Sequence, residues 1–102
     1  MSVFMRGTTP THTFHTSIDL TGAVVLFITY KQLYNTVLEK DISDCEITSD
    51  SVTVHLTQAE TLMFQANLDV EIQIRARFAD GTAVGCDILV SDVHRILKDG
   101  VI

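Results

Sequence analysis

The sequence is poor in the residues on which several specialised kinds of protein depend. Tryptophan is absent, and proline occurs once in 102 residues, as Pro10. Because proline cannot donate to a β-ladder, this leaves every later segment free to pair in sheets. Two cysteines, Cys45 and Cys86, are too few for the disulfide framework of a small secreted protein. We expect reduced thiols and an intracellular origin, with a single bridge left open because the sequence does not give the Cα separation.

Positive charge and long apolar runs are also scarce. Seven Lys and Arg stand against thirteen Asp and Glu, which gives a net charge of −6 and a pI near 4.9. Phosphate binding needs clustered basic residues, and these are scattered, so a nucleic-acid partner is not expected. The longest apolar run, residues 23–28, is far too short to cross a bilayer. Residues 1–10 lack the apolar segment of a secretion signal, so we expect no membrane partner either.

Apolar side chains are nevertheless plentiful. They make up 46% of the residues, and the mean hydropathy is +0.27. A disordered chain would be poor in Val, Ile, Leu and Phe, so the composition indicates a packed core. At 11.3 kDa we expect one domain over residues 1–102.

The clearest pattern is strict alternation of apolar and polar residues over 70–78. This period is typical of an antiparallel strand with one buried and one solvated face. Asp80-Gly81 follows, and further apolar runs cover 82–84 and 88–90. An Asp-Gly pair between two such runs predicts a β-hairpin whose two central residues both take positive φ.

Similar patterns predict strands elsewhere. Residues 23–30 are apolar on both faces, and a run buried on both sides indicates a central strand or one face of a tight sandwich. A turn at Lys31-Gln32 would join it to the next strand, and Ser49-Asp50-Ser51 predicts a second hairpin turn. After an extended lead-in over 1–10, the predicted strands cover 11–18, 23–30, 33–39, 45–48, 52–56, 70–78, 82–84 and 86–90. The remainder, 91–102, is expected to be a last strand or a tail that docks on a partner.

One segment changes to a helical period. Thr57-Gln58-Ala59-Glu60 matches a capping box, in which the Thr hydroxyl and the Glu carboxylate each accept a backbone N–H. We predict a short helix over 58–65 that crosses between two sheets, with Asn67 closing it in a left-handed conformation. The whole pattern predicts an all-β antiparallel sandwich with one short helix.

Candidate metal and catalytic residues do not form a recognisable motif. On a strand, His12 and His15 point to opposite faces, so surface histidines are expected rather than a metal pair. Cys45 and Cys86 lack zinc-ligand spacing, and a dyad of either with His55 or His94 is only arithmetically possible. We therefore predict no catalytic, cofactor or metal residues and no cofactor.

Charged clusters have ordinary explanations as well. Asp41, Asp44, Glu46 and Asp50 do not match a calcium loop and are expected to form a solvated acidic rim. A second group, Arg75 and Arg77, shares the wet face of one predicted strand. These arginines are expected to pair with acids across the sheet, with a contact patch as the alternative.

Four segments carry a family resemblance. They are Arg6-Gly7-Thr8-Thr9-Pro10-Thr11 with Phe14, Leu56-Thr57-Gln58-Ala59-Glu60-Thr61 with Phe64, 70–75 with 80–82, and 95–102. Together they resemble small proteins encoded near tail and baseplate genes in phages and prophages of Gram-positive bacteria. Three signals are similar in type and order to the N-terminal Ig-like domain of phage baseplate upper proteins: Leu20-Thr21-Gly22-Ala23, 56–60 and 79–82.

The resemblance implies an Ig-like β-sandwich and a non-enzymatic structural or adaptor protein of a phage tail or baseplate. Its partners would be other tail proteins or further copies of itself, in the virion or the host cytoplasm. Free strand edges and the apolar pair Val101-Ile102 could serve by strand addition. The alternative is a small ligand-binding or carbohydrate-binding module. Sugar-binding sites display exposed aromatic side chains. A carbohydrate-binding module is therefore favoured if Tyr30 and Tyr34 both lie exposed on one face.

Overall fold

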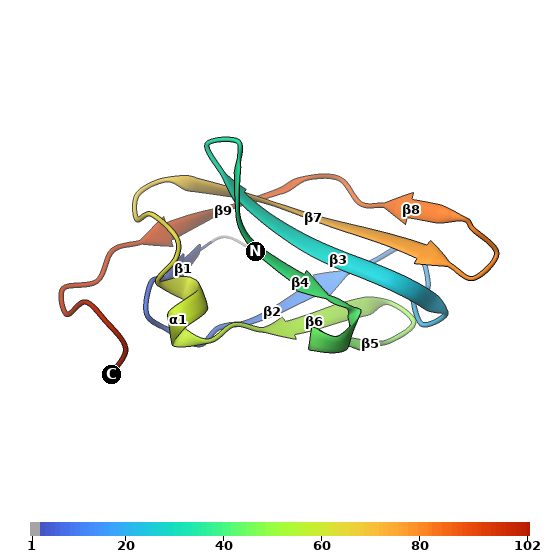
Figure 1. Cartoon of the computed structure of the whole chain (residues 1–102), viewed down its shortest axis with the longest axis horizontal. Helices are drawn as coiled ribbons and strands as arrows, with labels where there is room; N and C mark the ends of the chain where they lie inside the picture. Colours follow the sequence, from blue (N-terminus) through green and yellow to red (C-terminus); the bar gives the residue numbers. More distant parts are fainter. Residues whose placement is uncertain (1–2) are drawn as a thin grey trace.

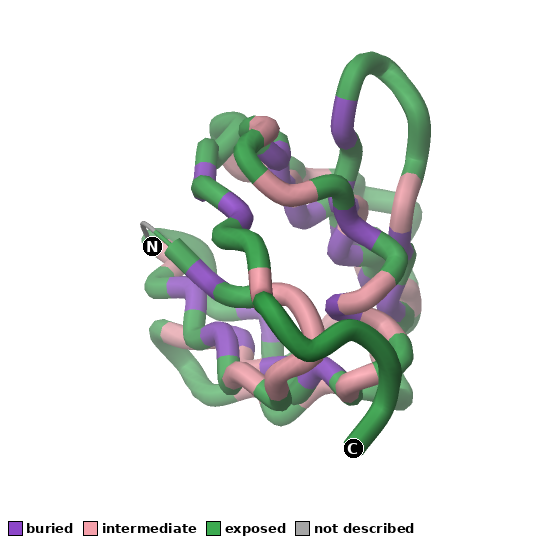
Figure 2. The backbone as a smooth tube through the Cα atoms, turned by 90° about the vertical axis from the view of Figure 1, so that its left-hand side faces the viewer, coloured by how far each residue is buried: buried purple, intermediate pink, exposed green. Residues whose placement is uncertain are grey.

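Two β-sheets lie face to face in the computed structural model, which describes residues 3–102 (Figure 1). The larger sheet has the strand order β1 (Val3–Met5), β9 (Leu89–His94), β7 (Asp69–Phe78), β3 (Ala23–Gln32), β4 (Asn35–Asp41), with β8 (Ala83–Gly85) also paired to β7. The smaller sheet has the order β2 (Thr11–His15), β6 (Ser51–His55), β5 (Cys45–Ile47). Buried residues alternate with exposed ones along the strands (Figure 2).

This strand order is that of an Ig domain of the variable type. Such a domain places the G, F, C and C′ strands in one sheet and the B, E and D strands in the other. Here β9, β7, β3 and β4 take the first set of places, and β2, β6 and β5 take the second. The predicted all-β, Ig-like sandwich is confirmed. One pair, β1 with β9, is parallel, whereas a wholly antiparallel sandwich was expected.

Strand β7 fulfils the prediction made from its alternation. Val70, Ile72 and Ile74 point into the core, and Glu71 and Arg75 between and beside them are exposed. The strand pairs antiparallel with β3 on one side and with β8 and β9 on the other. Because the strand is buried on one face and solvated on the other, its sequence alternates strictly between apolar and polar residues.

Strand β3 is central, as predicted, but the prediction that both of its faces are buried is wrong. Leu26, Ile28 and Tyr30 are fully buried, whereas the ring of Phe27 is 41% exposed. The inner residues pack between the sheets, and no described element covers the outer face of the larger sheet. The apolar outer residues of β3 are therefore a surface feature rather than a second core.

The turn after β3 lies two residues later than predicted. Gln32 is still in the strand and pairs with Asn35, so the turn consists of Leu33 and Tyr34. Both turn residues have positive φ, 48° and 67°, a combination typical of a type I′ hairpin. The buried amide of Gln32 determines this position: it donates to the carbonyls of Gln65 and Leu68 and accepts from the N–H of Gln65.

The Asp80-Gly81 hairpin joins β7 to β8 as predicted, but through a different turn. Arg77 pairs with Ala83, and the Phe78 N–H donates to the Thr82 carbonyl, which leaves a three-residue loop over 79–81. In that loop only Gly81 has positive φ, at 92°. This matches a type I turn closed by a left-handed glycine rather than a type I′ turn.

The last strand, predicted over 86–90, is instead β9, over Leu89–His94. Residues 86–88 interrupt it because side-chain contacts of Cys86 replace ladder bonds. Its Sγ accepts the N–H of Ile74 at 3.2 Å, and its carbonyl accepts the side-chain amide of Gln73 at 3.0 Å. The register shifts by one residue across this point, since Ala76 pairs with Val84 and Ile72 with Leu89. The two short strands therefore resemble one bulged strand.

The smaller sheet follows the prediction closely. Val52 and Val54 of β6 are fully buried, and Ser51 begins the strand after the expected turn. Strand β2 ends at His15, because residues 16–18 form a bend rather than the predicted continuation. That bend is held by the Thr16 N–H, which donates to the carbonyl of Asp50.

Helix α1 (Gln58–Thr61) crosses between the sheets and begins at Gln58, as predicted, but it ends four residues before the predicted end at Gln65. Thr57 and Glu60 form the predicted capping box. The chain leaves the helix at Leu62, and Asn67 takes a left-handed φ of 62° five residues later. No helix among residues 3–102 is long and apolar enough to cross a membrane.

The predicted lead-in contains strand β1 and an arginine that holds the helical region. Met1 and Ser2 lie outside the described residues. Arg6 donates to the carbonyls of Phe64 and Leu62 and forms an ion pair with Asp99 at 3.4 Å. The first two contacts satisfy carbonyls that the short helix leaves unpaired, so the Arg6-Gly7-Thr8 segment has a structural explanation.

The Leu33-Tyr34 turn generates a stability prediction. Replacing Leu33 by Asn and Tyr34 by Gly supplies the residues that tolerate positive φ. We expect the free energy of unfolding to rise by about 1 kcal/mol, measured by urea denaturation. Tyr34→Ala is the control, since it removes the ring without relieving the backbone, and an equal gain from it would contradict this explanation.

Candidate functional site

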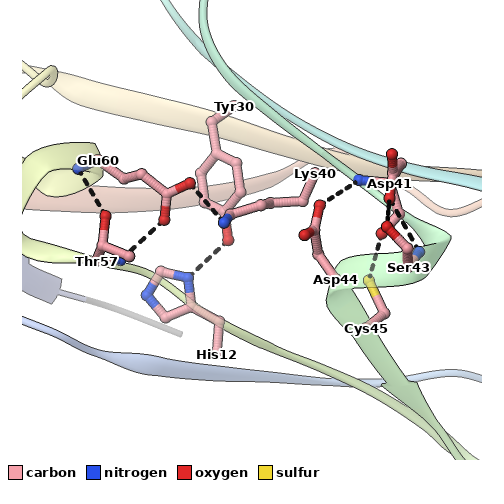
Figure 3. A network of polar contacts seen from close by, with 9 residues as sticks. All are labelled: His12, Tyr30, Lys40, Asp41, Ser43, Asp44, Cys45, Thr57 and Glu60. Carbon is pink, nitrogen blue, oxygen red and sulfur yellow. Dashed lines mark hydrogen bonds and ion pairs between the residues drawn. The ribbon is translucent and has the colours of Figure 1, made fainter.

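A polar pair lies in the core between the sheets. The Nδ1 atom of His12 on β2 and the hydroxyl of Tyr30 on β3 are 2.7 Å apart (Figure 3). Both residues are buried, so the expectation of a surface histidine is wrong for His12. Their rings belong to an edge-to-face cluster with Phe4, Phe14 and Phe64. His15 is exposed, as the opposite-face argument required.

Burial shifts the titration of both members of this pair. It lowers the pKa of His12 from 6.5 to about 4, because the charged imidazolium would lose its water. Burial also raises the pKa of Tyr30, and the charges of Cys45 and Glu60 add to that shift. Neither residue lines the hollows of the surface described below. The pair is therefore neutral at pH 7 and acts in packing rather than on a substrate.

Lys40 and Glu60 extend the polar contacts toward the surface. The ammonium of Lys40, on β4, forms an ion pair with the carboxylate that completes the capping box of α1 (Figure 3). Although burial works in the opposite direction, hydrogen bonds from Lys40 and Thr57 hold the pKa of Glu60 below its usual value. This pair connects the edge of the larger sheet to the helix between the sheets.

Two acidic residues and Cys45 lie next to Lys40, where β4 ends and the chain enters a short helical turn. Asp41 and Asp44 form a reciprocal cap on the 3-10 helix η1 (Ile42–Asp44), which accounts for them structurally. The Cys45 thiol donates to the carbonyl of Asp41 at 3.3 Å. Burial, followed by the charges of Asp44 and Asp41, raises the pKa of Cys45 to about 11. Such a thiol is a poor nucleophile at pH 7.

The remaining candidates are dispersed. Cys86 lies beside the larger sheet and Cys45 on the smaller one, and both thiols are free. His55 is exposed and lies 3.9 Å from Glu46, and His94 is exposed at the end of β9. Among residues 3–102, no three His, Cys, Asp or Glu side chains are grouped so that they could hold a metal ion.

The outer face of the larger sheet is the clearest candidate for a functional surface. Phe27 lies in its middle, between Arg75 of β7 and Asp41 of β4 in the strand register. Around it is a shallow hollow of about 360 Å³, lined by Val25, Phe27, Thr29, Glu39, Arg75, Ala76, Arg77 and Ala83. A partly exposed aromatic ring beside arginines is a composition common in interface centres.

Arg75 and Arg77 do not form the expected ion pairs across the sheet. The ion pairs in the described chain are Arg6–Asp99, Lys40–Glu60 and the weak His55–Glu46 contact. The cross-strand neighbours of Arg75 are Phe27 and Gly85, which offer no carboxylate. The alternative, a contact patch, stays a prediction.

A second hollow, of about 350 Å³, opens between the sheets beside β2. Its lining includes Phe14, Ile18, Leu20, Ile74 and Leu89. β2 is one of the two edge strands of the smaller sheet in the described chain. Pro10 and Thr16 bond toward β6, so the backbone groups of 11, 13 and 15 point away from it. This edge is open to a further strand.

The two tyrosines do not share an exposed face. Tyr30 is fully buried, and Tyr34 is 90% exposed at the tip of the β3–β4 turn. The condition that would have favoured a carbohydrate-binding module is therefore not met. Sequence reasoning missed Phe27 as a surface residue, and only its neighbours on the wet face of β7 indicated this site.

Comparison with models of protein families finds no match, and comparison with curated proteins finds none. Among solved structures, the chain is similar to the V domain of amphioxus IgVJ-C2, with a TM-score of 0.37 and 11% sequence identity. The similarity covers 92% of this chain and 99% of that one. The Ig-like assignment rests on the strand order.

The buried histidine generates a pH prediction. Because its folded pKa lies below its unfolded value, protonation favours the unfolded chain, so the stability from neutral His12 is complete above pH 6.5 and falls toward pH 4. We expect this loss to be about 2 kcal/mol, allowing for partial solvent screening. The measurement is the free energy of unfolding between pH 7 and 4 for the wild type and His12→Gln, which does not titrate.

The difference between these two proteins should shrink by that amount as the pH falls. His15→Gln, on the exposed face of the same strand, is the matched control and should follow the wild type at every pH. A constant difference between the wild type and His12→Gln would show that folding leaves the pKa of His12 unchanged, which would contradict this prediction.

Proposed function

We propose that this protein is a non-enzymatic structural or adaptor protein that acts through contacts with other proteins. The observation that carries the proposal is the uncovered outer face of the larger sheet, centred on Phe27 and the unpaired Arg75 and Arg77. An exposed aromatic on a central strand lowers solubility unless it is covered by a partner. Guanidinium groups beside such a ring favour a partner that offers carboxylates.

The place of action we propose is a phage or prophage tail or baseplate. Support comes from the resemblance of residues 6–11, 56–61, 70–82 and 95–102 to small proteins encoded near tail genes. The first three of these segments correspond to fold signals in the structure: the Arg6 contacts, the capping box and the β7–β8 hairpin. The partners proposed are other tail proteins, and the location is the virion or the host cytoplasm.

Co-expression with the products of the genes that flank its own tests this function. We expect at least one tail component to be retained on the tagged protein. Phe27→Asp should reduce that retention at least ten-fold, because it places a carboxylate in the apolar centre of the face. Leu97→Asp, at a side chain that is 93% exposed on the C-terminal segment, is the matched control and should retain the partner.

The two parts of the proposal fail separately. Retention of a tail component at full strength by the Phe27→Asp chain would contradict the use of this face. Retention of no neighbouring gene product would contradict the tail assignment. Circular dichroism of each variant confirms that the chains compared are folded.

A further inference from the structure

The charges on the outer face of β7 are ordered along the strand. Its outward-facing residues run Asp69, Glu71, Gln73, Arg75 and Arg77, of which Gln73 is half-buried and the other four are exposed, so two negative charges, a neutral amide and two positive charges follow one another. Because alternate residues share one face of a strand, all five side chains lie on the same surface. The sequence of charges is antisymmetric about Gln73.

We propose that this face binds a second copy of the same chain, with the two β7 strands antiparallel and facing each other across a two-fold axis at Gln73. In that arrangement Arg75 faces Glu71 of the second copy, and Arg77 faces its Asp69. The contact is isologous, so each ion pair occurs twice. The reverse arrangement, with parallel strands, would bring arginine against arginine and is disfavoured by repulsion. The inference rests on the proposed function, since it names a partner for the same face.

The neighbouring strands are compatible with this contact. In the register of the larger sheet, Phe27 lies beside Arg75, and Lys31 lies beside Glu71. The same two-fold axis therefore places Phe27 opposite Lys31 of the second copy, where the ring and the ammonium attract each other. Thr29 lies near the axis, and its hydroxyl donates to the Glu39 carboxylate, which keeps that acid within its own sheet.

A second copy would also stabilise the acidic end of β7, where two carboxylates lie side by side. Asp69 lies directly opposite Asp92 of β9, and this neighbour raises the pKa of Asp69, by hydrogen bonding first and by its charge second. Two carboxylates in this position repel each other in the isolated chain. A guanidinium group from a second copy would neutralise them. A standard interface takes about 800 Å² from each partner, which is roughly an eighth of the 6127 Å² surface of this chain.

A charge-swap experiment tests the proposal, with sedimentation equilibrium as the measurement. We expect the wild type to dimerise. The variants Arg75→Glu/Arg77→Glu and Asp69→Arg/Glu71→Arg should each dissociate, with the Kd for self-association raised at least 100-fold. An equimolar mixture of the two variants should dimerise again, because one now has an acidic strand face and the other a basic one. Arg95→Glu/Lys98→Glu, which reverses two charges on the C-terminal segment, should remain dimeric.

Cross-linking gives a second test that does not depend on charge reversal. Gln73→Cys should be joined to itself by a short bismaleimide, because the residue lies on the axis. Glu71→Cys should form no such homodimer, but should be joined to Arg75→Cys when the two are mixed. Peptide mass mapping separates these products from any that involve Cys45 or Cys86.

Three results would overturn the inference: a wild type that is monomeric at 100 μM and above, dimers that survive both reversals, or reversed variants that do not recover on mixing. The first removes self-association while leaving the retention of a tail component on Phe27 intact. The second excludes this face, and the third excludes charge pairing between the two β7 strands. The direction of the strands is tested by the cross-linking of Glu71→Cys with Arg75→Cys.

Discussion

The hydrogen bond between His12 and Tyr30 is the contact on which the relation of the two sheets depends. It is a polar contact within an aromatic cluster that draws on β1, β2, β3 and the loop after α1. Apolar packing alone tolerates sliding of one layer on the other, whereas a 2.7 Å contact between two directional groups does not. Because a buried hydroxyl or imidazole without a partner is costly, each residue requires the other in place. This pair therefore specifies how the sheets are aligned, in addition to the stability that the core provides.

Local patterns accounted for the elements whose interactions are local. The alternation in β7, the turn over 49–51 and the capping box at Thr57 and Glu60 involve residues that lie within a few positions of one another. The β3–β4 turn was misplaced because its position depends on Gln32, whose partners are more than thirty residues away. The burial of His12 was missed for the same reason, since Tyr30 is eighteen residues further along the chain. In the last strand, the decisive group was the sulfur of Cys86, which no sequence pattern assigns to a backbone N–H.

The candidate surface was only half visible in the sequence. Arg75 and Arg77 were recognised on a wet face, because β7 is buried on one side alone. Phe27 was not, because an apolar run such as 23–28 is expected of a strand covered on both sides. The structure has two sheets, so each sheet has one inner face and one outer face. Only the inner faces supply the core, and the outer face of β3 is left uncovered. The outward-facing half of this hydrophobic run therefore forms an exposed surface rather than a second buried layer.

The parallel pairing of β1 with β9 has a mechanical consequence. These strands come from opposite ends of the chain, with Val3 beside Asp92 and Met5 beside His94. Tension between the two ends would pull β1 backward along its axis and β9 forward along its own. All the hydrogen bonds of the pair would then resist together in shear, instead of opening one after another as in a peeled hairpin. The Arg6 contacts with the carbonyls of Phe64 and Leu62 lie immediately behind β1 and would resist the same displacement. The fold is thus braced along the line that joins its ends.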